Sequence, residues 1–152
     1  MRIELIVWSC FICAGPMATV VSSQESRDEE GASEALRGTF VAIKCVKDGT
    51  AMTQSAVPIM TCDEIRITIA EGQQTVAGQY QIDATTDPPR IKLVTSSNQF
   101  VMNISYGFKD DRLTLCFNLT PNGDAPDSLT SRNGDNRMSV VFAPLIKRRQ
   151  EN

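Results

Sequence analysis

Apolar and polar residues alternate over most of the chain from Gly38 onward, and this period of two constrains the fold more than any other feature. The clearest case covers residues 64–69, where three isoleucines are separated by Arg66 and Thr68. Successive side chains of a β-strand point to opposite faces, so the alternation indicates a strand with one buried face. Six further segments show the same pattern: Phe40–Val46, Val76–Ile82, Ile91–Leu93, Phe100–Phe108, Leu113–Leu119 and Met138–Phe142. The sequence therefore predicts seven strands.

Turn-forming residues separate these segments. Four dipeptides tolerate a positive φ, and a fifth segment contains two prolines that cannot continue a ladder. They are Asp48-Gly49, Glu71-Gly72, Asn122-Gly123, Asn133-Gly134 and Asp87-Pro88-Pro89. Short connections favour antiparallel pairing of neighbouring strands. Because an open sheet would expose two edges and one apolar face, we expect an antiparallel meander that closes into a small barrel of about seven to eight strands.

Length and composition agree with one compact all-β domain. The 152 residues are enough for a single core, and 41% hydrophobic with 22% charged residues is close to the globular average. No segment keeps the apolar spacing of an amphipathic helix for more than two turns. We therefore expect little helix, with one short helix considered within Thr50–Met60.

Residues 1–23 have the outline of a secretory signal peptide. Arg2 precedes an apolar run over residues 5–14, and small residues follow at 21–23 as a cleavage site. The run is half the length of about twenty residues that a membrane span needs. An uncleaved anchor or a buried first strand are the alternatives. We expect an exported protein, periplasmic or secreted, with no stable membrane span after cleavage.

The next segment, residues 24–36, is strongly acidic. It carries five acidic residues against one basic residue, which predicts a flexible linker or at most a frayed helical turn. The remaining residues, 37–152, hold 13 basic and 12 acidic side chains and no basic stripe, so we expect no nucleic-acid partner. The predicted organisation is a signal peptide (1–23), a linker (24–36), one β-barrel domain (37–148) and a polar tail (149–152).

Short motifs occur in a fixed order between residues 36 and 148. They are Gly38-Thr39-Phe40, the Asp48-Gly49 turn, Gly78 to Asp83, Pro89 to Leu93, Tyr106 to Phe117 and Val140 to Arg148. In this order they resemble a family of small exported domains of unknown function from planctomycete bacteria. The chain departs from that pattern at Phe40, where the family usually has Trp, and over residues 120–137, which lack an Arg-Pro motif.

The opening and closing motifs are also similar to the lipocalin signature, in which an arginine of the last strand covers an aromatic ring at the base of the barrel. The analogy implies a lipocalin-like barrel with Phe40 under Lys147 or Arg148. Phe40 and Arg148 are the candidate barrel-base pair, a cation–π contact of about 0.5–1 kcal/mol. Because a fold does not determine a function, this resemblance implies no ligand.

Cys45, Cys62 and Cys116 lie after the predicted cleavage site. Export permits disulfides, and Cys45 ends the first predicted strand while Cys62 begins the next. A Cys45–Cys62 disulfide is one interpretation; it would constrain a loop of about 16 residues and contribute about 3 kcal/mol. The other interpretation is three free, mostly buried cysteines. We expect Cys116 to lie on the face opposite Leu113, Leu115 and Phe117.

No pattern of catalytic or metal-binding residues is present. The chain has no His, so Cys116 lacks the usual base for a nucleophile, and no two of the three later cysteines are spaced as zinc ligands. The acidic residues of 124–136 match no calcium loop and are interpreted as turn formers. We expect no catalytic residue, no cofactor and no metal. A hydrolase that uses carboxylates and a hydroxyl is the enzymatic alternative.

An inward stripe of large apolar side chains is the candidate ligand site. Its residues are Phe100, Met102, Ile104, Tyr106, Leu115 and Phe117. A barrel of eight strands is just wide enough for its own side chains or one small ligand, so the stripe is either plain core or the lining of a cavity. The hypothesis is an exported, non-enzymatic barrel that binds a small apolar ligand or an envelope protein. The alternative is a structural or inhibitory interaction module without a small ligand.

Overall fold

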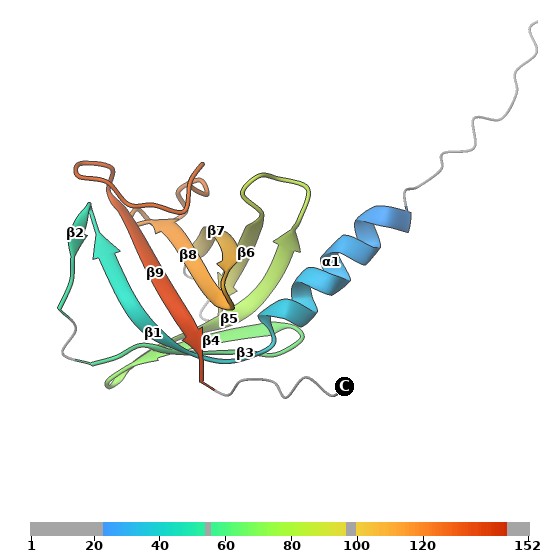
Figure 1. Ribbon diagram of the computed structural model, residues 1–152, viewed down its shortest axis with the longest axis horizontal. Coiled ribbons are helices and arrows are strands. Elements are labelled where there is room, and N and C mark those ends of the chain that lie inside the picture. The colour runs from blue at the N-terminus through green and yellow to red at the C-terminus, as the bar shows by residue number, and fades with distance from the viewer. Residues whose placement is uncertain (1–22, 54–55, 97–99, 146–152) are drawn as a thin grey trace, which may run out of the picture.

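A computed structural model describes residues 23–53, 56–96 and 100–145. This part of the chain contains one helix and nine strands (Figure 1). In chain order they are α1 (Ser23–Leu36), β1 (Gly38–Lys47), β2 (Thr50–Ala51), β3 (Ile59–Cys62), β4 (Arg66–Glu71), β5 (Gln74–Asp83), β6 (Arg90–Thr95), β7 (Val101–Lys109), β8 (Arg112–Asn118) and β9 (Arg137–Pro144).

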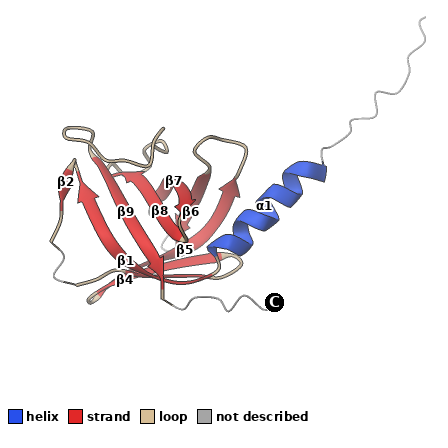
Figure 2. Cartoon of the chain, viewed as in Figure 1, coloured by secondary structure: helices blue, strands red, loops and turns tan. Residues whose placement is uncertain are grey.

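The strands form a closed antiparallel barrel. From β3 to β9 each strand pairs with the next, and β1 pairs with β3 on one side and with β9 on the other. Eight strands, β1 and β3 to β9, therefore complete the barrel, while β2 adds a short hairpin arm to β1. Figure 2 shows strands in nearly all of the barrel wall and the single helix at its side. The predicted all-β meander that closes on itself is confirmed.

The short helix considered within Thr50–Met60 is wrong. Thr50 and Ala51 pair with the end of β1, and Ile59–Cys62 forms β3 between β1 and β4. Within β3 only Met60 and Cys62 point into the core, so the alternation is too short to identify a strand. Backbone pairing with β1 and β4 determines the conformation here.

The inward side chains of all eight strands make one core. Ile43 is an extra residue in β1, where the pairing with β9 shifts between Ala42 and Lys44, so inward side chains come from Phe40, Ala42 and then Cys45. The core consists of Leu36, Phe40, Ala42, Cys45, Met60, Cys62, Ile67, Tyr80, Ile91, Leu93, Ile104, Tyr106, Leu113, Leu115, Val140 and Phe142.

A helix replaces the flexible linker expected over residues 24–36. α1 lies beside β5 (Figure 1), and its last residue, Leu36, is fully buried in the barrel core. The segment lacks an apolar stripe, which is why the sequence pattern did not indicate a docked helix. One leucine anchors it, because burial of a single large aliphatic side chain contributes about 1.5–3 kcal/mol.

Several predictions concern residues outside the described part of the chain. These are the signal peptide up to residue 22, the polar tail (149–152), and Lys147 and Arg148 as partners of Phe40. Phe40 itself is 5% exposed and belongs to the core.

Candidate functional site

The two ends of the barrel carry different connections. Because the strands alternate in direction, the turns after β3, β5 and β7 lie at one end, together with α1; we call this the helix end. The turns after β1 and β4 and the long β8–β9 loop lie at the other end, which we call the loop end. In Figure 1 α1 lies on the right and the β1–β2 turn on the left.

The helix end is filled and its polar groups are paired. Leu36, Phe40 and Cys62 are buried there together with Tyr80. The Tyr80 hydroxyl donates to the carbonyl of Asp63 at 2.8 Å, and the Ser33 and Tyr80 hydroxyl oxygens lie 3.4 Å apart. Burial raises the pKa of Tyr80 to about 12, so its hydroxyl remains a neutral donor. These contacts connect α1 to the wall of the barrel.

The loop end leaves inward-facing apolar side chains partly exposed. Ile69, Met102, Phe117 and Met138 pack against the core but are only half-buried, and each lies within two residues of the loop-end terminus of its strand. We call these four residues the apolar mouth. A fifth half-buried residue, Ile82, belongs to the helix end. Apolar surface that faces a barrel interior and remains in contact with solvent is what a small apolar ligand would cover.

The six residues expected to line a cavity fall into three groups. Ile104, Tyr106 and Leu115 are 1%, 4% and 1% exposed and are core residues. Met102 and Phe117 belong to the apolar mouth. Phe100, half-buried, directly precedes β7. The structure therefore places two of the six in the apolar mouth, three in the core, and Phe100 half-buried before β7.

The β8–β9 loop, residues 119–136, folds over the outer face of the wall instead of across the mouth. The Ser105 hydroxyl of β7 donates to the carbonyl of Pro126, and the Ser139 hydroxyl of β9 donates to the carbonyl of Leu129 at 2.8 Å. The amide nitrogen of Asn103 donates to the carbonyl of Gly123 at 2.8 Å. This loop thus covers β7, β8 and β9 from outside and creates a second buried layer.

Cys116 lies in that second layer. It is absent from the core inside the barrel yet has 0% exposed surface, which confirms the predicted face opposite its neighbours Leu113, Leu115 and Phe117. Burial raises the pKa of the Cys116 thiol from 9.0 to about 11. The protonated thiol is a poor nucleophile, so the environment of Cys116 is that of a structural side chain.

The structure does not bring Cys45 and Cys62 together. Cys62 pairs with Gly38 at the beginning of β1, whereas Cys45 is seven residues further along that strand and pairs with Val140 of β9. Seven residues of β-strand span about 20 Å, and a disulfide requires Cα atoms within about 7 Å. The geometric basis of the Cys45–Cys62 disulfide is therefore wrong: the intervening residues form the β2 arm and a loop instead of a simple hairpin.

Two acidic residues of the β8–β9 loop bind groups close to them in the chain. The Asp135 carboxylate accepts from the amides of Arg132 at 2.7 Å and Arg137 at 3.0 Å, and Asp127 forms an ion pair with the Arg137 side chain at 2.9 Å. Across the described residues, no three His, Cys, Asp or Glu side chains are grouped as metal ligands.

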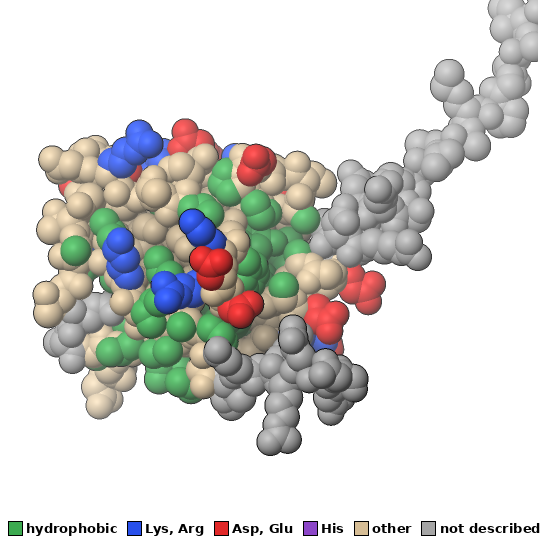
Figure 3. All heavy atoms as spheres, in the orientation of Figure 1, with side chains coloured by type: hydrophobic (Ala, Val, Ile, Leu, Met, Phe, Trp, Pro, Cys, Tyr) green, Lys and Arg blue, Asp and Glu red, His purple; other side chains and the backbone are tan. Residues whose placement is uncertain are grey.

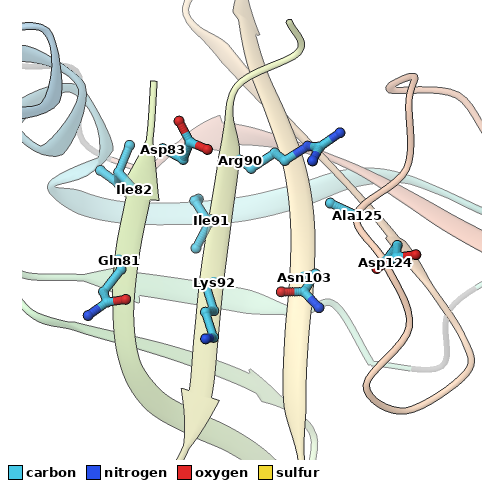
Figure 4. Close-up of a pocket in the computed structure, with 9 residues that line it drawn as sticks. All are labelled: Gln81, Ile82, Asp83, Arg90, Ile91, Lys92, Asn103, Asp124 and Ala125. Atoms are coloured by element: carbon cyan, nitrogen blue, oxygen red, sulfur yellow. The ribbon is translucent and has the colours of Figure 1, made fainter. Parts of the chain in front are cut away.

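A polar groove opens on the outer wall of β5, β6 and β7, where sequence reasoning placed no site. Its volume is about 520 Å³ (Figure 4). The lining residues are Gln81, Ile82, Asp83, Arg90, Ile91, Lys92, Asn103, Asp124 and Ala125. The only signal in the sequence was alternation on β5 and β6, which places charged residues outward; the far side of the groove comes from the β8–β9 loop and depends on its tertiary position.

An apolar patch lies on the outer face of β1, β3 and β9. Ile43, Val57, Ile59 and Leu145 are 42–55% exposed, and Val41 connects the strands by pairing with Ile59 and Ala143. Figure 3 shows hydrophobic side chains gathered on this face. Nothing in the described ranges covers it.

Comparison with protein families, curated proteins and solved structures finds no match for this chain. The structure is therefore similar to a lipocalin only in the shape of its closed antiparallel barrel. None of the helical residues that the structure describes forms a helix long and apolar enough to cross a membrane.

Proposed function

We propose that this protein is an exported, non-enzymatic binding domain that takes a small apolar molecule at the loop end of its barrel. The observation that carries the proposal is the apolar mouth. Ile69, Met102, Phe117 and Met138 face inward and are only half-buried, whereas Leu36 and Phe40 at the helix end are covered.

The size and chemistry of the mouth support a small ligand. Below it the barrel is filled by side chains such as Leu93, Leu115 and Val140, so a ligand would cover the core and would not enter deeply. Methionine has an unbranched, polarisable side chain that adapts to irregular shapes, and two of the four mouth residues are methionines. Covering apolar surface stabilises a complex by about 25 cal/mol per Å² before the cost of association.

A non-enzymatic role is consistent with the environment of the reactive groups. Cys116 is protonated and enclosed, and the Asp83 carboxylate accepts from the amide and hydroxyl of Thr85 at 3.0 and 2.5 Å. Neither geometry presents a nucleophile or a base to a bound molecule. The proposal of export rests on the outline of a signal peptide in residues 1–23 and on the resemblance to exported planctomycete domains.

The neutral fluorescent probe N-phenyl-1-naphthylamine tests the mouth. We expect saturable fluorescence enhancement that weakens at least several-fold in Met138→Gln and Met102→Gln, because each substitution replaces apolar surface at the mouth by an amide. Ile59→Gln is the matched control: Ile59 is 42% exposed on the outer wall, so the same change there should leave probe binding unchanged.

Two results would overturn the proposal. One is the absence of saturable probe binding by the folded protein, checked by circular dichroism; this result favours the alternative of an interaction module without a small ligand. The other is an equal loss in Ile59→Gln and the two mouth variants, which would assign the probe to the apolar patch. Native mass spectrometry of protein from its own host should show a bound small molecule.

A further inference from the structure

The polar groove on the outer wall is separate from the apolar mouth and has a different chemistry. Two rows of paired residues form its floor. One row runs Gln81, Lys92, Asn103 across β5, β6 and β7, and the next pairs Asp83 with Arg90. Asp124 and Ala125 of the β8–β9 loop form the far side. The groove therefore has a rigid floor of paired strands and one side made by a loop that Asn103 holds in place through its bond to Gly123.

Two cations of the floor are available to a ligand. Neither Arg90 nor Lys92 forms an ion pair with any residue in the described ranges, whereas Arg37 and Arg137 both do. Figure 4 shows the Arg90 side chain extending across β7 toward Ala125, with Lys92 on the same strand below it. An arginine fork and a lysine two residues apart on one face suit a carboxylate, since Arg binds both of its oxygens and Lys adds a second donor.

Two carboxylates also line the groove, and they differ in availability. Asp83 is held by Thr85, and these hydrogen bonds lower its pKa. Asp124 is engaged through its backbone carbonyl, which accepts from the Asn118 amide at 2.6 Å, and its carboxylate forms no ion pair with a described residue. The groove thus presents two cations on its floor and one carboxylate on the loop side that form no ion pair with a described residue, while Arg90 also acts electrostatically on Asp83 opposite it.

We propose that this groove binds a small zwitterion with a carboxylate and an ammonium group, such as an amino acid or a short peptide. The carboxylate lies on Arg90 and Lys92, and the ammonium group faces Asp124. The two cations and two carboxylates of the lining sum to zero, which favours a dipolar ligand over a multiply charged anion. The lining has no aromatic side chain on which a sugar ring would stack, and a volume of about 520 Å³ is within the range of small-molecule sites.

Titration of the isotope-labelled protein with diglycine, followed by NMR, tests the proposal. We expect saturable shifts confined to the backbone amides of Gln81, Lys92, Asn103 and Ala125. The affinity should fall about tenfold in Arg90→Gln and in Asp124→Asn, because each variant removes one charged hydrogen-bonding partner. Lys44→Gln is the matched control, since Lys44 is an exposed β1 cation outside the groove and its loss should change nothing.

Ligands that carry only one of the two charged groups test Arg90 and Asp124 separately. Acetate binding should weaken in Arg90→Gln but not in Asp124→Asn, and methylammonium binding should weaken in Asp124→Asn but not in Arg90→Gln. Each should bind more weakly than diglycine. Inorganic phosphate binding more tightly than diglycine would overturn the proposal in favour of a simple anion site, as would shifts spread over the whole surface. The result is independent of the proposed function, because Met138→Gln should leave diglycine binding intact.

Discussion

The two ends of the barrel differ in how their inward apolar side chains are covered. At the helix end α1 places Leu36 inside the barrel, with 0% of its surface exposed. At the loop end the β8–β9 connection contains 18 residues, 119–136, yet it packs on the outer wall through Ser105 and Ser139 and leaves the mouth partly open. A long connection is therefore not a lid by virtue of its length. Its hydrogen-bond partners determine which surface it covers.

The largest expected effect is at the helix end. Leu36→Ala should lower the free energy of unfolding by about 2–5 kcal/mol, because it removes a fully buried side chain and leaves a cavity. Met138→Ala at the mouth should cost clearly less, since Met138 is half-buried and solvent can fill the space. Urea denaturation followed by circular dichroism measures both. Equal costs would contradict the difference between the ends.

The second prediction concerns Cys116, which is buried beneath the β8–β9 loop. The pKa of Cys116 is raised to about 11 in the folded protein against 9.0 for an ordinary thiol. As the pH rises, the thiol of the unfolded chain therefore loses its proton before the thiol of the folded protein does. The contribution of Cys116 to the free energy of unfolding is complete below pH 9 and is lost between pH 9 and 11. The free energy of unfolding should fall by about 1–1.5 kcal/mol between pH 7 and pH 10 from this group.

Cys116→Ala is the variant that isolates this contribution. Urea denaturation at pH 7, 9 and 10 should show a shallower decline in stability than in the parent protein. Part of the decline should remain, because burial also raises the pKa of Cys62 at the helix end. An unchanged pH dependence in Cys116→Ala would show that the loop does not keep the thiol out of water.

The smallest expected effect concerns the surface of the helix end. Arg37 and Glu64 form an ion pair at 3.2 Å, with their side chains 42% and 72% exposed. Glu64→Gln should change the free energy of unfolding by less than about 0.5 kcal/mol, because water screens such pairs. The same urea assay measures it. A loss approaching that of Leu36→Ala would mean that charge and not burial holds α1 to the barrel.

Sequence reasoning succeeded where the signal was local and repeated. Alternation over residues 65–69, 100–108 and 113–119 identified β4, β7 and β8 and most of their inward residues. It was wrong at Ile65, which precedes β4 and is 63% exposed, and at Phe108, which is 43% exposed near the end of β7. It also placed Cys116 on the outward face. It failed at β3, which is four residues long, and at α1, whose single anchoring leucine makes no periodic pattern.

The candidate sites were less predictable than the fold. Alternation identified Met102 and Phe117 as inward, but whether they are core or mouth depends on which end of the barrel is covered. The groove was missed because Arg90 and Asp124 are 34 positions apart in the chain and meet only through the path of the β8–β9 loop. The Cys45–Cys62 disulfide, one of the two interpretations that the sequence left open, does not fit the structure because Cys62 pairs with the start of β1 and Cys45 lies seven residues further along that strand.

By itself the sequence determined seven of the strands, most of their inward residues and an antiparallel order, because these depend on side-chain period and on turn residues adjacent in the chain. Closure of the meander was predicted from the sequence, but only the tertiary structure decided that Leu36 fills one end and that the β8–β9 loop covers the outer wall instead of the other end. These outcomes depend on hydrogen bonds and packing between residues far apart in the chain, and no local pattern encodes such contacts.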